Sequence, residues 1–278
     1  MTGQPRTDDV VGLPADASAY DAGVVGEGLR ADEQDRLVHQ RKTLESAHTQ
    51  HEPEGLVGAH GVTVSPAHWA RFGLWADHPG DLLRLSRNDV TAVARRCRET
   101  NDWLPLLITS YAWGYGRRGV GPARLSRIFD GTPRVAALPK PEINHRLAGA
   151  VEALDSHGPS AAYNFLLAEW RIPALGPAFF SKFLYFADRA VSGERCRALI
   201  LDSRLARSMR RIWERRAAEP YAAGGYAARW LWQGPSWTSY RYQVYLAFLH
   251  RAAAQLSQSG ERWTPELVEF LFFLDNGD

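Results

Sequence analysis

Residues 174–183 (ALGPAFFSKF) decide the fold, because they repeat the pattern of residues 119–128 (GVGPARLSRI) without a gap. Gly, Pro, Ala and Ser coincide in the two copies, and Arg127 stands opposite Lys182. Each copy places small, turn-forming residues before a proline, which suits the first turn of a helix. The repeat therefore predicts two tight connections, each between two helices. An ordinary connection in any helical protein has the same pattern.

The segments around the repeat are helical in pattern as well. Residues 86–100 open with a serine that suits the N-cap and carry Val90, Ala94 and Cys97 on one face. Almost no stretch alternates with period two, so the sequence predicts an all-α body, folded as a two-lobed helical bundle. The other predicted helices cover residues 102–111, 122–129, 142–154, 160–170, 177–190, 203–216, 238–256 and 264–274.

Length and charge divide the chain into two parts. The 278 residues are 45% hydrophobic and 23% charged, which is enough apolar mass for a sizeable core. Residues 1–60 carry 5 Lys and Arg against 11 Asp and Glu, whereas residues 61–278 carry 28 against 20. We therefore expect residues 1–60 to form an acidic, flexible leader with one helix over residues 31–48, and residues 61–278 to form the body.

Several classes of protein are excluded by what the sequence lacks. No stretch approaches the roughly 18 consecutive apolar residues of a membrane span, and the amino terminus lacks the layout of a signal peptide, so we expect a cytoplasmic protein. Cys97 and Cys196 are isolated, and the nine histidines are scattered. This pattern predicts no disulfide framework, no zinc site and no iron–sulfur cluster.

Lys182 is a candidate nucleophile. It lies in an apolar run, residues 179–186 (FFSKFLYF), where its amine must be partly buried, reach a cavity or be paired. Burial favours the neutral amine, and the neutral amine is the form that attacks carbon. The alternative is a lysine whose side chain reaches the surface at the edge of the hairpin.

Asp202 is a candidate carboxylate for the same chemistry. It follows three aliphatic residues, 199–201, and precedes an amphipathic helix, so it suits the N-cap of that helix. The helix dipole keeps such a carboxylate ionised. It could then stabilise positive charge on a sugar or move a proton, and this role is compatible with capping.

The order of these features resembles the helix–hairpin–helix DNA glycosylases, in particular their 8-oxoguanine DNA glycosylase branch. The resemblance covers residues 103–216 best. It implies two helical lobes that grip double-stranded DNA through the hairpin and take up a flipped, damaged base between them. By resemblance, Lys182 attacks the anomeric carbon to form a Schiff base while Asp202 assists. The implied DNA contacts are Ala174, Leu175, Gly176 and Pro177 of the hairpin, with Arg204 and Arg207.

The sequence departs from the family pattern at two places. Ala174 stands where the hairpin has its first glycine, which weakens the approach of a phosphate. The family lysine falls at the position of Ala178, whereas Lys182 lies one helical turn later on the same face. The iron–sulfur cysteines of the endonuclease III branch are absent, which argues against that branch.

Other features are compatible with DNA but also with ordinary structure. Residues 195–216 contain eight arginines against Asp202 and Glu214, as a phosphate-binding edge or a solvated helix face would. Trp113 and Tyr115 lie in a segment rich in aromatics, glycine and arginine that suits base stacking. Tyr242 is the aromatic residue near the carboxyl end that we assign to the base pocket.

The resemblance further implies that the chemistry needs no metal, although a monovalent cation at the hairpin is compatible with it. We expect a nucleoid-associated monomer that excises a damaged base and nicks the strand by β-elimination. Two rival classes stay open, a non-catalytic DNA-binding hairpin protein and a purely structural helical protein without DNA affinity. Within the glycosylase interpretation, a monofunctional enzyme that uses Asp202 alone is a further alternative.

Overall fold

The structure, a computed structural model, describes residues 11–47, 52–192, 197–216 and 224–275. Helices make up most of these residues, which confirms the predicted all-α class. The chain folds as two compact units. Unit 1 combines residues 1–57 with residues 194–278, and unit 2 comprises residues 58–193. Within the described residues, no helix has both the length and the apolar character to cross a membrane.

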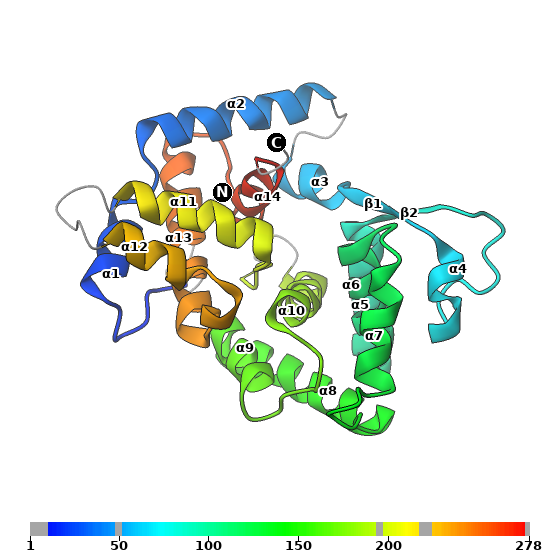
Figure 1. The fold of residues 1–278 in the computed structure, drawn as a ribbon. Helices are drawn as coiled ribbons and strands as arrows, with labels where there is room; N and C mark the ends of the chain where they lie inside the picture. The colour runs from blue at the N-terminus through cyan, green and yellow to red at the C-terminus, as the bar shows by residue number, and fades with distance from the viewer. Residues whose placement is uncertain (1–10, 48–51, 193–196, 217–223, 276–278) are drawn as a thin grey trace. The chain divides into compact units, whose positions relative to one another are not determined.

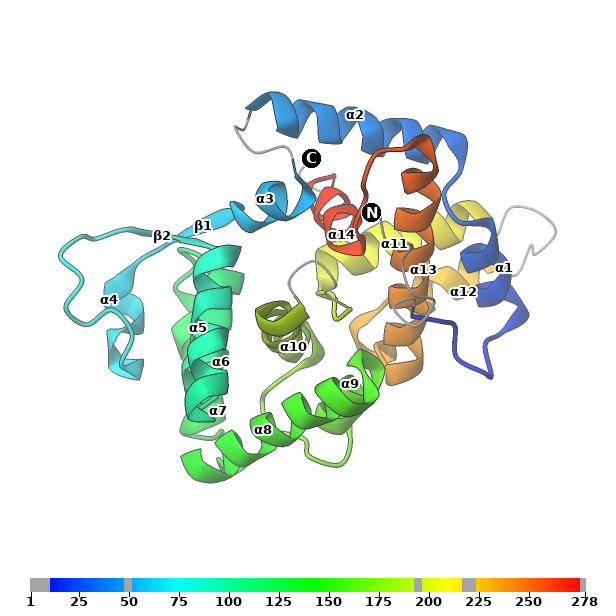
Figure 2. The ribbon, with the colours of Figure 1, turned by 180° about the vertical axis from the view of Figure 1, so that it is seen from behind.

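Unit 2 is built on the hairpin helix α10 (Pro177–Ser192), against which α5, α6, α8 and α9 pack (Figure 1). Residues 180–189 of α10 are all buried, and they include the polar Ser181, Lys182, Asp188 and Arg189 besides the apolar residues. Figure 2 shows α5, α6 and α7 side by side from behind. The other helices of this unit are α4 (Pro66–Trp69), η2 (Ala70–Phe72), α5 (Arg87–Thr100), α6 (Leu104–Tyr115), α7 (Val120–Phe129), α8 (Lys140–His157) and α9 (Pro159–Leu167).

A small sheet in unit 2 was not predicted. Strands β1 (Gly61–Val64) and β2 (Leu83–Ser86) pair antiparallel, with Gly61 opposite Ser86 and Val64 opposite Leu83. Each strand has four residues, too few for a period-two pattern to stand out. The sheet ends at Ser86, whose hydroxyl accepts from the amide of Asp89 and so begins the predicted helix α5.

His60, directly before β1, makes unit 2 sensitive to acid. Burial, together with the positive charges of Arg87 and Arg84, lowers the pKa of His60 from 6.5 to about 4. As the pH falls from 6.5 to 4, His60 therefore binds a proton in the unfolded chain but stays neutral in the folded chain. The free energy of unfolding decreases over this range. Relative to wild type, His60→Gln should reduce this decrease by about 2 kcal/mol. Urea denaturation at pH 7.5 and pH 4.5 measures the free energy of unfolding of both proteins. An equal decrease between the two pH values in wild type and His60→Gln would contradict the expectation.

Unit 1 joins the amino-terminal helices to those of the carboxyl-terminal third. Helix α13 packs against α1 and α14, and α14 in turn contacts α11 and α2. These elements are α1 (Ala19–Glu27), α2 (Ala31–Ala47), α3 (Pro53–Gly58), α11 (Ser203–Arg216), α12 (Gly224–Leu231), η4 (Gly234–Ser236), α13 (Ser239–Leu256), η5 (Ser257–Ser259) and α14 (Pro265–Leu274). The helix predicted over residues 31–48 is confirmed as α2.

The predicted flexible leader is wrong for residues 11–47, which are an integral part of unit 1. Asp21 of α1 is buried, and its carboxylate accepts hydrogen bonds from Arg241 (2.7 and 3.2 Å), Trp213 (2.8 Å) and Tyr240 (2.9 Å). Burial alone would raise the pKa of Asp21, but these donors and the charge of Arg241 lower it below its usual range. A carboxylate thus anchors the first helix to α11 and α13.

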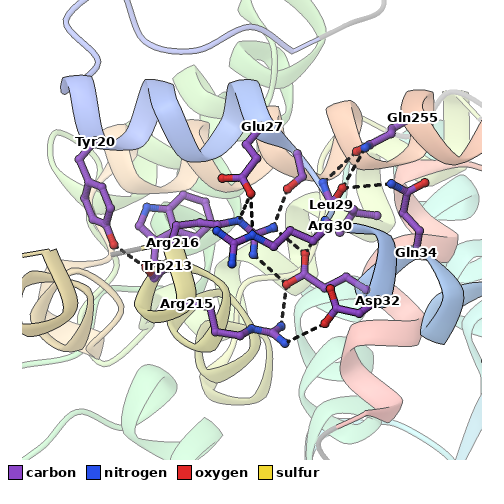
Figure 3. A network of polar contacts seen from close by, with 12 residues as sticks. Tyr20, Glu27, Leu29, Arg30, Asp32, Gln34, Trp213, Arg215, Arg216 and Gln255 are labelled. Atoms are coloured by element: carbon purple, nitrogen blue, oxygen red, sulfur yellow. Dashed lines mark hydrogen bonds and ion pairs between the residues drawn. The ribbon is translucent and has the colours of Figure 1, made fainter. Parts of the chain in front are cut away.

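A second buried ion pair anchors α2 (Figure 3). Arg216 of α11 donates to both carboxylate oxygens of Glu33, at 3.0 and 2.6 Å, and to the carbonyl of Gly28 at 2.7 Å. Arg215 approaches the same carboxylate to 2.7 Å. Burial would raise the pKa of Glu33, but the hydrogen bonds and charges of these arginines lower it. The leader therefore docks through buried charges, which a search for apolar periodicity does not detect.

Candidate active site

The connection between α9 and α10 covers residues 168–176, and it ends in a turn that leads into Pro177. Ala174 adopts a positive φ of 63°, a conformation that favours glycine. The buried Leu175 donates its amide to the carbonyl of Ile172 at 3.1 Å. The carbonyl of Gly176 accepts from the amides of Phe179 and Phe180, so Gly176 caps α10 and Pro177 begins it. Ala174 thus holds a conformation that a glycine would adopt more readily.

Ala174→Gly is expected to stabilise the protein by about 1 kcal/mol. The methyl group of an alanine at positive φ is strained, and glycine removes the strain, although part of the gain is lost to the greater entropy of the unfolded chain. Chemical denaturation measures the change. A destabilised Ala174→Gly variant would show that the alanine methyl group makes a contact that outweighs its strain.

Lys182 is buried within α10, with 5% of its surface exposed. Its Nζ donates to the carbonyl of Ala178 at 3.1 Å and lies 5.4 Å from the centre of the Phe179 ring. The stem of the side chain packs against Gly114 of α6, where an added Cβ would lie 3.2 Å from Cδ and 3.3 Å from Cε. The prediction that this amine is withdrawn from solvent is confirmed, and Gly114 is a neighbour that sequence reasoning missed.

An aromatic stack lies beside this lysine. The Phe179 ring stacks on Tyr111 at 4.0 Å and on Tyr115 at 4.8 Å between ring centres. Burial raises the pKa of the Tyr111 hydroxyl, whereas Tyr115 is only half-buried and accepts from Arg124 of α7 at 3.1 Å. Tyr115 is therefore placed close to Lys182 through a shared neighbour. The spacing of Phe179 and Lys182, three residues apart on one helix, could have indicated this.

Trp113 lies in a different environment from Tyr115. It is buried, with its ring edge-on to Phe186 at 5.3 Å and to His60 at 6.0 Å. The guanidinium carbon of Arg87 lies 5.3 Å from the centre of the same ring. Trp113 is thus a packing residue of unit 2 in this structure, because the face that would stack a base is occupied by protein groups.

Asp202 caps helix α11, as its position predicts. Its Oδ1 accepts from the amides of Arg204 at 3.0 Å and Leu205 at 3.3 Å, and its carbonyl accepts from Ala206 at 2.8 Å. The side chain is half-buried. The carboxylate therefore sits at the positive end of the helix dipole, where its ionised form is stabilised.

Tyr242 contacts the segment before Asp202 instead of lining an open pocket. It is completely buried on α13, where its hydroxyl donates to the carbonyl of Leu199 at 2.8 Å and accepts from the amide of the same residue at 3.2 Å. The nearby Tyr245 donates to the carbonyl of Ile200 at 2.6 Å. Sequence reasoning placed Tyr242 at a base pocket because its ring is aromatic, and it missed the role of the hydroxyl.

Only some of the arginines of residues 195–216 form an exposed basic edge, because Arg207, Arg211 and Arg215 are exposed at helical spacing on α11. Arg215 and Arg216 pair with Glu33, and Arg210 pairs with Glu214 at 2.6 Å. Arg204 is half-buried, with its guanidinium carbon 4.8 Å from the centre of the Phe273 ring. Arg207 is exposed. Arg195 lies outside the described residues.

The comparison with family models identifies the chain. A model described as "Putative 8-oxoguanine DNA glycosylase OGG-like protein" matches residues 55–273. The chain belongs to this family. The match of the OGG-like family includes both Lys182 and Asp202 and begins after helices α1 and α2. No curated protein matches the chain, and no solved structure does.

The two candidate groups of this OGG-like protein belong to different units. Lys182, Tyr115 and the α9–α10 connection lie in unit 2, whereas Asp202 and Tyr242 lie in unit 1. Among the described residues, no group of three His, Cys, Asp or Glu side chains is arranged to hold a metal ion.

Proposed function

We propose that this OGG-like protein excises an oxidised purine such as 8-oxoguanine from double-stranded DNA, with Lys182 as nucleophile and Asp202 as the assisting carboxylate. The observation that carries the proposal is the buried amine of Lys182 on the helix that follows the hairpin turn, in a chain of this family. Structural lysines are seldom buried to this extent, and a primary amine is the group that forms an imine with a sugar carbon.

The proposed reaction needs only these two side chains. The amine of Lys182 donates its electron pair to C1′ of the flipped nucleotide, the bond from C1′ to the base breaks, and the base leaves with the bonding electrons and gains a proton. The carboxylate of Asp202 stabilises the positive charge that develops on the sugar. Opening of the sugar ring turns the amine adduct into an imine, from which β-elimination cleaves the 3′ phosphate. The lysine is restored by hydrolysis of the imine.

Two features of unit 2 favour DNA as the ligand. Gly176 has no other atom within 4 Å of where a Cβ would lie, so a phosphate can approach the backbone of the turn. Residues 103–129 contain four arginines and no acidic residue, and Arg117 and Arg118 are exposed in the turn between α6 and α7. We propose that both turns contact phosphates, with Arg207 as a further contact from α11. We also propose that the α9–α10 turn can bind a monovalent cation.

Base excision is tested in single-turnover reactions on duplexes that carry a panel of damaged bases, at two salt concentrations. Wild type should release one class of oxidised purine, and Asp202→Asn should slow release by about 100-fold or more. Affinity for the duplex should fall steeply with salt. Binding that depends on salt, without release of any base of the panel, would favour the non-catalytic DNA-binding interpretation.

A monofunctional glycosylase is the second candidate, and one observation favours it. The Nζ of Lys182 donates to the carbonyl of Ala178 at 3.1 Å and lies 5.4 Å from the centre of the Phe179 ring, so the amine already has partners within its own helix. In this case Asp202 activates a water molecule, and Lys182 takes no part in the attack on C1′. Base release without strand cleavage, retained in Lys182→Gln, would establish this candidate.

A further inference from the structure

Helix α13 holds the backbone that leads to Asp202 through two tyrosine hydroxyls. Tyr242 satisfies both backbone groups of Leu199, since its hydroxyl donates to the carbonyl at 2.8 Å and accepts from the amide at 3.2 Å. Tyr245, three residues later on the same helix, donates to the carbonyl of Ile200 at 2.6 Å. Both tyrosines are completely buried, and their rings stack with centres 6.3 Å apart.

The held segment has no regular secondary structure of its own. Residues 199–201 are buried but belong to neither a helix nor a strand, so their backbone groups need partners from elsewhere in the fold. The tyrosine hydroxyls provide such partners. Asp202 follows without an intervening turn, and its Oδ1 then accepts from the amides of Arg204 and Leu205. The position of this carboxylate therefore depends on a backbone that is fixed immediately before it.

The amino-terminal helix fixes α13 itself. The carboxylate of Asp21 binds Arg241 and Tyr240 in the first turn of α13, and it also accepts from Trp213 of α11 at 2.8 Å. The carboxylate of Asp21 on α1 thus joins α11, which begins after Asp202, to α13, which carries the two tyrosines. Tyr242 lies next to Arg241 on α13, directly beside this anchor.

We propose that Tyr242 and Tyr245 are positioning residues for Asp202. They clamp Leu199 and Ile200 so that α11 begins at one place and its capping carboxylate keeps one orientation. The inference rests on the proposed function for its effect on catalysis, because it assigns Asp202 the assisting role. The clamp itself is a property of unit 1 and can be measured without any reaction.

Amide hydrogen exchange tests the clamp directly in the full chain. In Tyr242→Phe, exchange should become about tenfold faster at Leu199, which loses its acceptor, and also at Arg204 and Leu205, whose amides bind Asp202. Leu267 is the reference, because its amide donates to the Thr264 hydroxyl at the start of α14 in the same unit. Unchanged exchange at Arg204 and Leu205, or an equal change at Leu267, would overturn the proposal.

Catalysis gives the second readout, with Tyr20→Phe as the matched control. The hydroxyl of Tyr20 also donates to a backbone carbonyl, that of Trp213 at 2.6 Å, in the second half of α11. In Tyr242→Phe the single-turnover rate of base release should fall by about 10- to 100-fold with little change in DNA affinity, whereas Tyr20→Phe should stay within about twofold of wild type. Equal losses in both variants would overturn the positioning role.

The two readouts separate the possible failures. If wild type releases no base but Tyr242→Phe still accelerates exchange at Arg204 and Leu205, the proposed function fails and the clamp stands. If wild type releases a base and neither the exchange nor the rate of Tyr242→Phe changes, the clamp fails and the proposed function stands. The double variant Tyr242→Phe/Tyr245→Phe should show larger effects than either single one, since it frees both Leu199 and Ile200.

Discussion

Lys182→Gln is expected to reduce the borohydride-trapped adduct with damaged duplex DNA to below detection. A glutamine side chain is one atom shorter than lysine and remains polar and unbranched up to Cδ, but its amide nitrogen cannot form an imine. Trapping requires that imine, so loss of the adduct reports on the nucleophile and not on the fold. Denaturing electrophoresis after reduction measures it, and thermal unfolding shows that the variant is folded.

Lys140→Gln is the matched control, because the chain has only three lysines, Lys42, Lys140 and Lys182. Lys140 begins α8, with its Nζ 5.7 Å from the centre of the Phe129 ring, so the substitution removes a charge near an aromatic ring as Lys182→Gln does. The control should trap like wild type. Mass spectrometry of the adduct then assigns the modified residue, and an adduct on Lys42, Lys140 or the terminal amine would refute the role of Lys182.

Arg216→Met should lower the free energy of unfolding by about 3 kcal/mol. The side chain of Arg216 is 2% exposed and that of Glu33 is 0% exposed, so the variant leaves a buried carboxylate without its main partner. Arg215 still approaches Glu33 to 2.7 Å, which places the expected cost at the lower end of the range for a broken buried pair. Denaturation with urea at neutral pH measures the change.

Arg210→Met provides the comparison on the same helix. Arg210 pairs with Glu214 at 2.6 Å, but the two side chains are 40% and 34% exposed. Solvent screens such a pair, so the free energy of unfolding should change by less than about 0.5 kcal/mol. Equal effects of the two substitutions would show that burial does not determine the strength of these pairs in unit 1.

The helices of the body could be predicted because their signals are local. Caps such as Ser86, the proline at the start of α10 and apolar stripes at helical spacing are all read within a few residues. The same holds for the candidate side chains, since Lys182 and Asp202 stand out by their immediate neighbours. The positive φ of Ala174 could not be predicted, because alanine rarely adopts this conformation and its presence in a sequence does not indicate it.

The parts that the sequence did not predict depend on contacts between distant residues. Helices α1 and α2 dock through Asp21 and Glu33, whose partners lie about 180 to 220 residues later in the chain. Apolar periodicity carries no information about such pairs. The hydrogen bond from Tyr242 to Leu199 was missed for the same reason, because this partner is defined by the fold and not by the local pattern.

The anchoring of α1 and α2 also limits how the protein can be shortened. A fragment that starts at residue 55, where the family match begins, would lack Asp21, Glu27 and Glu33. Arg241 and Arg216 would then lose the carboxylates they pair with, and the surfaces of α13 and α14 that α1 and α2 cover would be exposed to water. Recombinant versions should therefore retain both amino-terminal helices, even though the family signature does not include them.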